Sequence, residues 1–105
     1  MTQVNFQKLA ATELQEVSNW YHERDAAVAE RFHSEIETCL SRIVEDPDSH
    51  PEPDSHPEEY RHYRWIRVRR FPYRLIYEQL DLDRILILAV AHTSRHPRYW
   101  KERLE

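Results

Sequence analysis

The chain has 105 residues and a formal net charge of −4, with 40% hydrophobic and 32% charged residues, a balance typical of a small globular protein. Its longest apolar run is the seven residues from Ile85 to Ala91, far short of the roughly 20 that span a membrane, and Met1 to Asn5 lack the regions of a secretory signal. Cys39 is the single cysteine, which excludes an intrachain disulfide and a structural zinc finger, so we expect a cytoplasmic protein. From its length we expect a single domain over residues 1–105.

The charge is unevenly distributed along the chain. Residues 1–44 carry a net charge of −3, residues 45–59 carry −7 with no basic side chain, and residues 60–105 carry +6. Ten of the eleven cations in the last segment are arginines, and the planar guanidinium group binds phosphate or carboxylate in a bidentate manner. This segment therefore indicates either a specific anionic partner or a solvated sheet face, and the charge pattern alone favours neither.

The first half of the chain predicts a short strand followed by two helices. Weak alternation around Val4 and Phe6 predicts the strand. Thr12 and Gln15 have the spacing of a capping box, which predicts that the first helix opens at Thr12, and Asp25 is a typical N-cap for the second. Apolar residues at helical spacing predict the buried faces: Leu14, Val17 and Tyr21 in the first helix, and Val28, Phe32, Ile36, Cys39, Leu40 and Ile43 in the second.

A tandem hexapeptide follows the second helix. Residues 47–52 and 53–58 both have the sequence Pro-Asp-Ser-His-Pro-Glu. Because this segment combines prolines and acids with no apolar side chain, it predicts a loop insertion over residues 47–58 that does not pack. His50 and His56 lie near carboxylates that suit a weakly held divalent metal, but duplication of a loop without a metal function is the favoured interpretation.

The second half of the chain changes from helical to strand-like periodicity. Alternation over residues 63–70 and 73–78 predicts two strands separated by Phe71-Pro72. Asp81 to Asp83 predicts a turn, and the continuous apolar run from Arg84 to Ala91 predicts a third strand that is buried on both faces. Three consecutive strands with short connections form an antiparallel meander.

Pro97 suits the first turn of a final short helix. The predicted order is therefore β-α-α-β-β-β-α, an α+β fold in which a helical hairpin packs on one face of a small, mainly antiparallel sheet and leaves the other face available. Glycine is absent from the chain, which excludes a glycine-rich phosphate loop and a nucleophile elbow.

Three segments in order carry a resemblance to a known family. They are Arg70-Phe-Pro-Tyr-Arg-Leu-Ile-Tyr77, the apolar strand ending in His92, and Arg95-His-Pro-Arg-Tyr-Trp-Lys-Glu-Arg103. Together they resemble the RelE/ParE superfamily of type II toxin–antitoxin toxins, in particular the ParE-like, plasmid-stabilisation branch. The resemblance implies a bacterial growth inhibitor whose partner is an antitoxin with a flexible C-terminal part, so that the assembly is a toxin–antitoxin hetero-oligomer.

The resemblance leaves two molecular targets open. The ParE-like branch acts on DNA gyrase, whereas the RelE-like branch cleaves mRNA on the ribosome without a metal. Arg67, Arg74, His92 and Tyr99 are the candidate catalytic residues for the ribonuclease, with the arginines stabilising the phosphorane and His92 or Tyr99 transferring a proton. Trp65, however, occupies a strand position where the ribonucleases tend to carry lysine.

The overall charge favours DNA gyrase over the ribosome as the target, and therefore a toxin that is not an enzyme. A net charge of −4 gives no long-range attraction toward dense RNA phosphate. A ribosome-dependent endoribonuclease is the first alternative, and an inactive antitoxin-binding module is the second.

Arginines of the basic segment are the candidate contacts to the antitoxin or the target, because an acidic partner peptide is attracted to such a surface. They are Arg67, Arg69, Arg74, Arg95, Arg98 and Arg103. His92 and His96 are four residues apart, a spacing that places two metal ligands on one face of a helix. However, the predicted strand ends at His92 and Pro97 follows His96, so we do not expect the two histidines to share a helical face. We expect neither a metal nor a cofactor.

Overall fold

The computed structural model describes residues 1–50 and 63–94 of the chain. Along the sequence it contains β1 (Gln3–Phe6), α1 (Lys8–Arg24), α2 (Ala26–Glu45), β2 (Tyr63–Arg67), β3 (Tyr73–Asp81) and β4 (Arg84–His92). Two helices therefore stand between the first strand and a three-strand meander, and the α+β prediction is confirmed for these elements. The predicted final helix after Pro97 lies outside the described residues.

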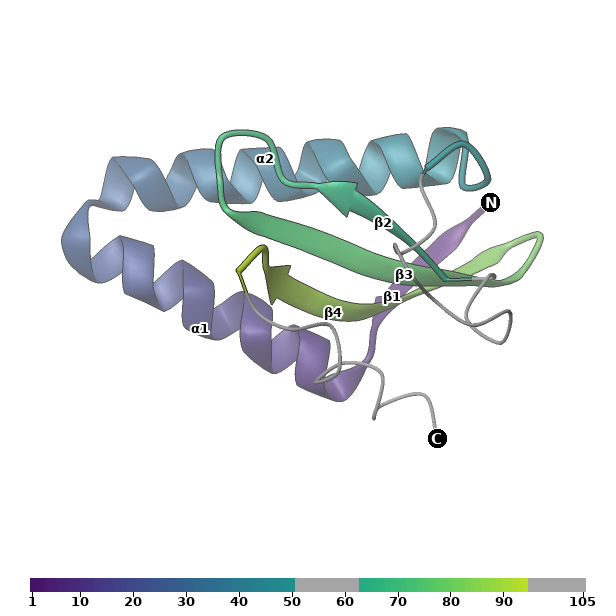
Figure 1. Ribbon diagram of the computed structural model, residues 1–105, viewed down its shortest axis with the longest axis horizontal. Helices are drawn as coiled ribbons and strands as arrows, with labels where there is room; N and C mark the ends of the chain where they lie inside the picture. The colour runs from purple at the N-terminus through teal and green to yellow at the C-terminus, as the bar shows by residue number, and fades with distance from the viewer. Residues whose placement is uncertain (51–62, 95–105) are drawn as a thin grey trace.

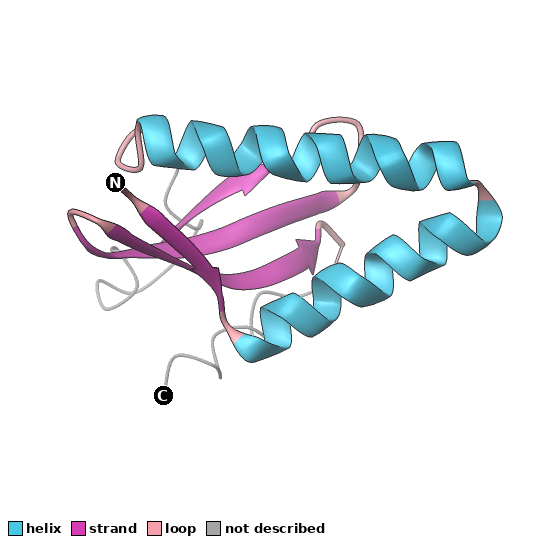
Figure 2. Ribbon diagram, turned by 180° about the vertical axis from the view of Figure 1, so that it is seen from behind, coloured by secondary structure: helices cyan, strands magenta, loops and turns pink. Residues whose placement is uncertain are grey.

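The strands form one mixed sheet in the order β1-β4-β3-β2. β1 pairs with β4 in parallel, while β3 is antiparallel to both β2 and β4. The chain returns from β1 to its parallel neighbour through both helices and the meander, so the two helices lie together on one face of the sheet (Figures 1 and 2). Among the described residues, no helix is long and apolar enough to cross a membrane.

The N-cap of helix α1 lies five residues earlier than the sequence pattern predicts. The N-cap is Gln7, whose side-chain oxygen accepts hydrogen bonds from the backbone N–H groups of Leu9 and Ala10. Thr12 is already inside the helix and donates its hydroxyl to the carbonyl of Lys8 at 3.2 Å. The predicted opening at Thr12 is therefore wrong, because a glutamine supplies the side-chain acceptor that Ser, Thr, Asp or Asn usually supplies.

Helix α2 has the limits that its sequence signals predict. Asp25 is the N-cap, and its carboxylate accepts a hydrogen bond of 2.9 Å from the backbone N–H of Ala27. The helix ends at Glu45, immediately before Asp46 and Pro47, because proline cannot continue the hydrogen-bond ladder. A hydrogen bond of 2.6 Å between Ser18 Oγ and His33 Nε2 joins the two helices.

The main core lies between the helices and the sheet. Its central side chain is Phe32, which is fully buried and contacts the rings of Tyr21 and Phe71 at centroid distances of 5.5 and 5.1 Å. The predicted faces of both helices point into this core, together with one face of the sheet. The core residues contributed by the sheet and its hairpin are Ile66, Val68, Phe71, Leu75, Tyr77, Ile85, Ile87 and Val90.

The second face of the sheet differs from the sequence expectation. Tyr63, Ile76, Leu88, Ala89 and Ala91 form a separate buried cluster there, with exposed fractions of 8% or less. The expectation that this face is available is therefore wrong at its centre, where β3 and β4 carry buried apolar side chains as they do on the core face. Arg67 and Arg74, at one end of this face, are exposed and half-buried respectively.

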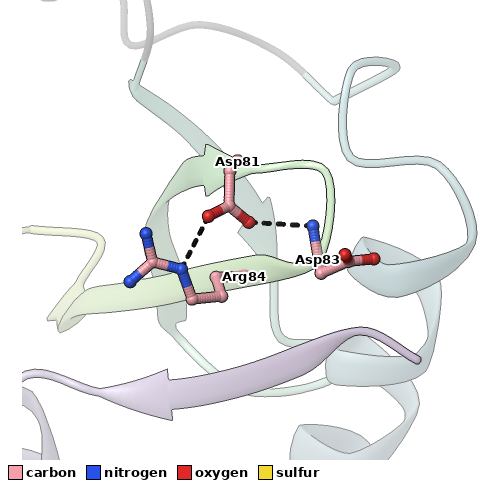
Figure 3. Close-up of polar contacts among 3 residues, drawn as sticks. All are labelled: Asp81, Asp83 and Arg84. Atoms are coloured by element: carbon pink, nitrogen blue, oxygen red, sulfur yellow. Dashed lines mark hydrogen bonds and ion pairs between the residues drawn. The ribbon is translucent and has the colours of Figure 1, made fainter.

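The turn between β3 and β4 is held by the side chain of Asp81, as Figure 3 shows. One carboxylate oxygen accepts a hydrogen bond of 2.9 Å from the backbone N–H of Asp83, and the other accepts one of 2.7 Å from Nε of Arg84. These bonds, with the Arg84 bond the strongest contributor, lower the pKa of Asp81 below its ordinary value of 3.8 because they favour the charged carboxylate.

We expect the Asp81 contacts to stabilise the fold above pH 3.8, and this contribution to be lost as the pH falls through the lowered pKa of the folded protein. An NMR titration of the Asp81 carboxyl carbon should give a pKa below 3.8, and Arg84→Gln should return it toward that value. An unchanged Asp81 titration in Arg84→Gln would contradict the role of the Arg84 bond.

Candidate partner-binding surface

Residues 63–74 form the most basic part of the described chain. This stretch contains five arginines and no acidic residue. It comprises β2, the connecting turn and the start of β3, so the antiparallel hairpin brings cations from both strands to one end of the sheet. The arginines are Arg64, Arg67, Arg69, Arg70 and Arg74.

Arg67 and Arg74 lie directly opposite each other in the β2–β3 ladder. Directly opposed residues of an antiparallel pair share a sheet face, with Cβ atoms about 5 Å apart. Trp65 is two residues before Arg67 and shares this face. It pairs with Ile76 and is therefore the diagonal neighbour of Arg74.

The guanidinium of Arg74 stacks on the indole ring of Trp65. The central carbon of the guanidinium lies 4.2 Å from the ring centroid, well within the range of a cation–π contact. Nε of Arg74 is buried and has no hydrogen-bond partner among the described residues. Within that same part of the chain, neither Arg74 nor Arg67 forms an ion pair with an acid.

The turn between β2 and β3 exposes two further arginines. The backbone N–H of Val68 donates to Tyr73 at 2.9 Å, and the N–H of Phe71 donates to Val68 at 3.1 Å. Phe71 is buried and anchors the turn in the core, whereas Arg69 and Arg70 are exposed. Arg70 has a φ of 70°, a left-handed conformation that costs a non-glycine residue about 1–2 kcal/mol.

His92 lies on the opposite face of the sheet from the Arg67–Arg74 pair. It is paired with Tyr73, and the two rings meet edge to face with centroids 5.2 Å apart. With Tyr73 and Pro72 it lines a cavity of about 360 Å³, whose other wall is α1 through Glu16, Val17, Trp20 and Tyr21.

A register shift in the β3–β4 ladder causes this placement. Tyr77 pairs with Ile87, but Ile76 pairs with Ala89, so Leu88 is an extra residue in β4. An extra residue exchanges the faces of all residues that follow it. Strict alternation from Ile85 would have put His92 beside Arg74.

The hydrogen bonds of His92 define its tautomer. Nδ1 accepts a hydrogen bond from the backbone N–H of Ser94 at 3.1 Å and lies 2.7 Å from the Ser94 hydroxyl. Because a backbone N–H can only donate, Nδ1 is the unprotonated nitrogen and the proton of the neutral ring is on Nε2. His92 is thus a locally bonded residue beside Tyr73.

The structure brings together only part of the predicted site. Arg67 and Arg74 form one surface with Trp65, Arg69 is exposed in the adjacent turn, and His92 is on the other face. Tyr99, Arg95, Arg98 and Arg103 lie outside the described residues. Sequence reasoning missed the stacking of Trp65 on Arg74, because the pairing register that makes them neighbours is not visible in either strand alone. Among the described residues, no group of three metal-binding side chains comes together.

The sequence over residues 4–97 matches the family model described as the ParE toxin of the type II toxin–antitoxin system parDE. The chain belongs to this ParE toxin family. As a ParE-family toxin it is one component of a toxin–antitoxin system, and an antitoxin is its partner. Among curated proteins, no relative matches the sequence.

Two solved structures share the fold of this ParE-family toxin. One is the chromosomal ParDE toxin–antitoxin system of P. aeruginosa, with a TM-score of 0.71 and 16% identity over 90% of this chain and 98% of the other. The second is the isolated RelE toxin of E. coli, with a TM-score of 0.61 and 18% identity over 100% of both chains. At these identities the similarity supports the fold, which is common to the ParE and RelE toxins.

Proposed function

We propose that this ParE-family toxin inhibits growth by acting on DNA gyrase in the cytoplasm, and that it does not cleave RNA. The observation that carries the proposal is the separation of His92 from the Arg67–Arg74 pair by the thickness of the sheet. Metal-independent cleavage of RNA needs cations at the phosphate and a proton-transfer group within hydrogen-bond reach of the same substrate. His92 does not meet that requirement.

The charge of the chain supports the same proposal. A protein with a net charge of −4 is not drawn over long range to the phosphate-rich decoding site of a ribosome. The net charge of +6 on residues 60–105 acts over a short range and suits contact with a defined protein surface. We assign this contact, to the antitoxin or to the target, to Arg67, Arg69 and Arg74, together with Arg95, Arg98 and Arg103.

A ribosome-dependent endoribonuclease is the second candidate function. One observation favours it: Arg67 and Arg74 are directly opposed in the ladder, and two guanidinium groups supply the positive charge and the hydrogen-bond donors that a scissile phosphate requires. In that case the proton would have to be transferred by a residue other than His92, and Tyr99 is the remaining candidate from the sequence.

Two assays with the purified toxin separate these functions. In a supercoiling reaction with purified gyrase, we expect loss of supercoiled product and accumulation of cleaved DNA held by the enzyme. In a parallel reaction with ribosomes programmed with mRNA, we expect the message to stay intact. Codon-specific cuts, with gyrase unaffected, would overturn the proposal in favour of the ribonuclease, and inactivity in both assays would favour the inactive antitoxin-binding module.

A further inference from the structure

We propose that Arg67 and Arg74 together bind one carboxylate of the antitoxin, and that Trp65 is the positioning residue that holds Arg74 for this contact. The inference rests on the presence of an antitoxin in a ParE-type system. It does not depend on whether the toxin acts on gyrase or on the ribosome, so it can fail or succeed separately from the proposed function.

The first support is an unbalanced pair of charges. Arg67 and Arg74 are directly opposed in the ladder, and like charges in this position repel each other. Among the described residues, no acidic side chain forms an ion pair with either of them. A bound oxyanion between the two guanidinium groups removes this repulsion and accepts hydrogen bonds from both.

The second support is the way in which Arg74 is held. Its guanidinium lies 4.2 Å above the ring of Trp65, its Nε is enclosed, and the residue as a whole is half-buried. The part of the guanidinium that faces solvent is therefore its Nη end. Stacking fixes the plane of this fork before a ligand arrives, which reduces the entropy lost on binding.

The third support concerns the class of ligand. Carboxylate and phosphate groups both fit a guanidinium fork, so the charge around the site must distinguish their sources. Residues 63–74 carry a net charge of +5, whereas the whole chain has a net charge of −4. A nucleic acid presents a phosphate at every nucleotide and meets that overall negative charge along its length. A peptide can place one acidic side chain at the pair and carry neutral residues elsewhere, so the observations favour a peptide carboxylate.

The test measures the affinity of the folded toxin for a blocked hexapeptide that carries one glutamate among neutral residues, by NMR at one low ionic strength, following the Nε–H resonances of the arginines. We expect Arg67→Gln and Arg74→Gln each to weaken binding about tenfold, which is the loss of one charge-assisted hydrogen-bonding group. The matched control is Arg31→Gln on the exposed surface of α2, and this variant should bind as the wild type does.

Trp65 is tested by two further variants. Trp65→Leu keeps an apolar side chain but removes the ring, and we expect it to weaken peptide binding about threefold. It should also shift the Arg74 Nε resonance, which the indole ring current affects, whereas Trp65→Phe should restore most of the affinity. Equal affinity of Trp65→Leu and the wild type, with the fold of the variant intact by its NMR spectrum, would overturn the positioning role.

Three results would overturn the carboxylate site itself. One is the absence of peptide binding at millimolar concentration, and another is an equal loss of affinity in Arg31→Gln and Arg74→Gln, which indicates attraction by net charge alone. The third is tighter binding of single-stranded hexauridylate than of the peptide at the same ionic strength, with the same dependence on Arg67 and Arg74. That last result would assign the pair to nucleic acid.

Discussion

Replacement of Phe32 by alanine should destabilise the fold by about 3–5 kcal/mol, the range observed when a buried phenylalanine is truncated. The side chain is fully buried in α2 and contacts the rings of Tyr21, Phe71 and Tyr73 at centroid distances of 5.5, 5.1 and 6.0 Å. Its removal leaves a cavity that these rings cannot fill without losing contacts with one another. Urea denaturation followed by circular dichroism measures the change in the free energy of unfolding.

The matched control lies on the same helix. Val44 is 38% exposed, and Val44→Ala should change the free energy of unfolding by no more than about 0.5 kcal/mol. Because small domains are stable by only about 5–15 kcal/mol, the Phe32 variant should be partly unfolded at growth temperature. A loss below about 1 kcal/mol in Phe32→Ala would contradict the central place of this ring in the core.

Replacement of Tyr77 by phenylalanine should cost about 1–3 kcal/mol, because it leaves a carbonyl without its buried partner. The hydroxyl of Tyr77 donates a hydrogen bond of 2.6 Å to the carbonyl oxygen of Pro47, and the residue is only 1% exposed. His50 packs on the same ring at 6.2 Å and accepts a hydrogen bond from Arg64 through its carbonyl. Tyr77 thus ties the segment after α2 to the sheet, so the prediction that residues 47–58 do not pack is wrong for Pro47 and His50. Residues 51–58 of that predicted loop lie outside the described residues.

The pH dependence gives a second measurement for Tyr77. Burial raises the pKa of its hydroxyl above the ordinary value of 10.0, so the neutral form is favoured in the folded protein. Its contribution to stability is complete below pH 10.0 and is lost as the pH rises toward the raised pKa. Wild type should therefore lose stability above pH 10.0 more steeply than Tyr77→Phe.

Tyr73→Phe is the control for the measurement at neutral pH. Tyr73 is half-buried, and its hydroxyl has no hydrogen bond among the described residues. We expect a change of no more than about 0.5 kcal/mol. If Tyr73→Phe and Tyr77→Phe had equal effects at neutral pH, the bond to Pro47 would not be the cause of the loss.

The sequence predicted those elements in which a local signal and the tertiary packing agree. Asp25 and the apolar stripe that contains Phe32 defined α2, because a side-chain cap and a helical period act within one turn. The start of α1 was predicted wrongly, because Thr12 and Gln15 imitate a capping box inside a helix that Gln7 had already capped. Local patterns of this kind do not show which of two adjacent caps the chain uses.

The site was predictable strand by strand but not across the sheet. Alternation predicted that Trp65 and Arg67 share one face of β2. It also predicted that Arg74 lies on the other face of β3 from Tyr73 and Tyr77, and the structure agrees on both points. The extra residue Leu88 in β4 reverses the face of everything after it, and a continuous apolar run gives no alternation from which a bulge could be detected. The resemblance grouped His92 with Arg67 and Arg74 as candidate catalytic residues, and the extra residue places His92 on the other face of the sheet.

Growth of a bacterial culture after induction of this chain alone, as wild type and as His92→Ala, is the most direct test of the proposed function. We predict that both proteins arrest growth while cellular mRNA stays intact, because His92 lies across the sheet from Arg67 and Arg74 and has no part in their chemistry. Normal growth with abundant folded wild-type protein would contradict the assignment as an active toxin. Growth arrest by wild type that is abolished in a folded His92→Ala variant, with cleaved mRNA in the wild-type culture alone, would contradict the proposed mechanism.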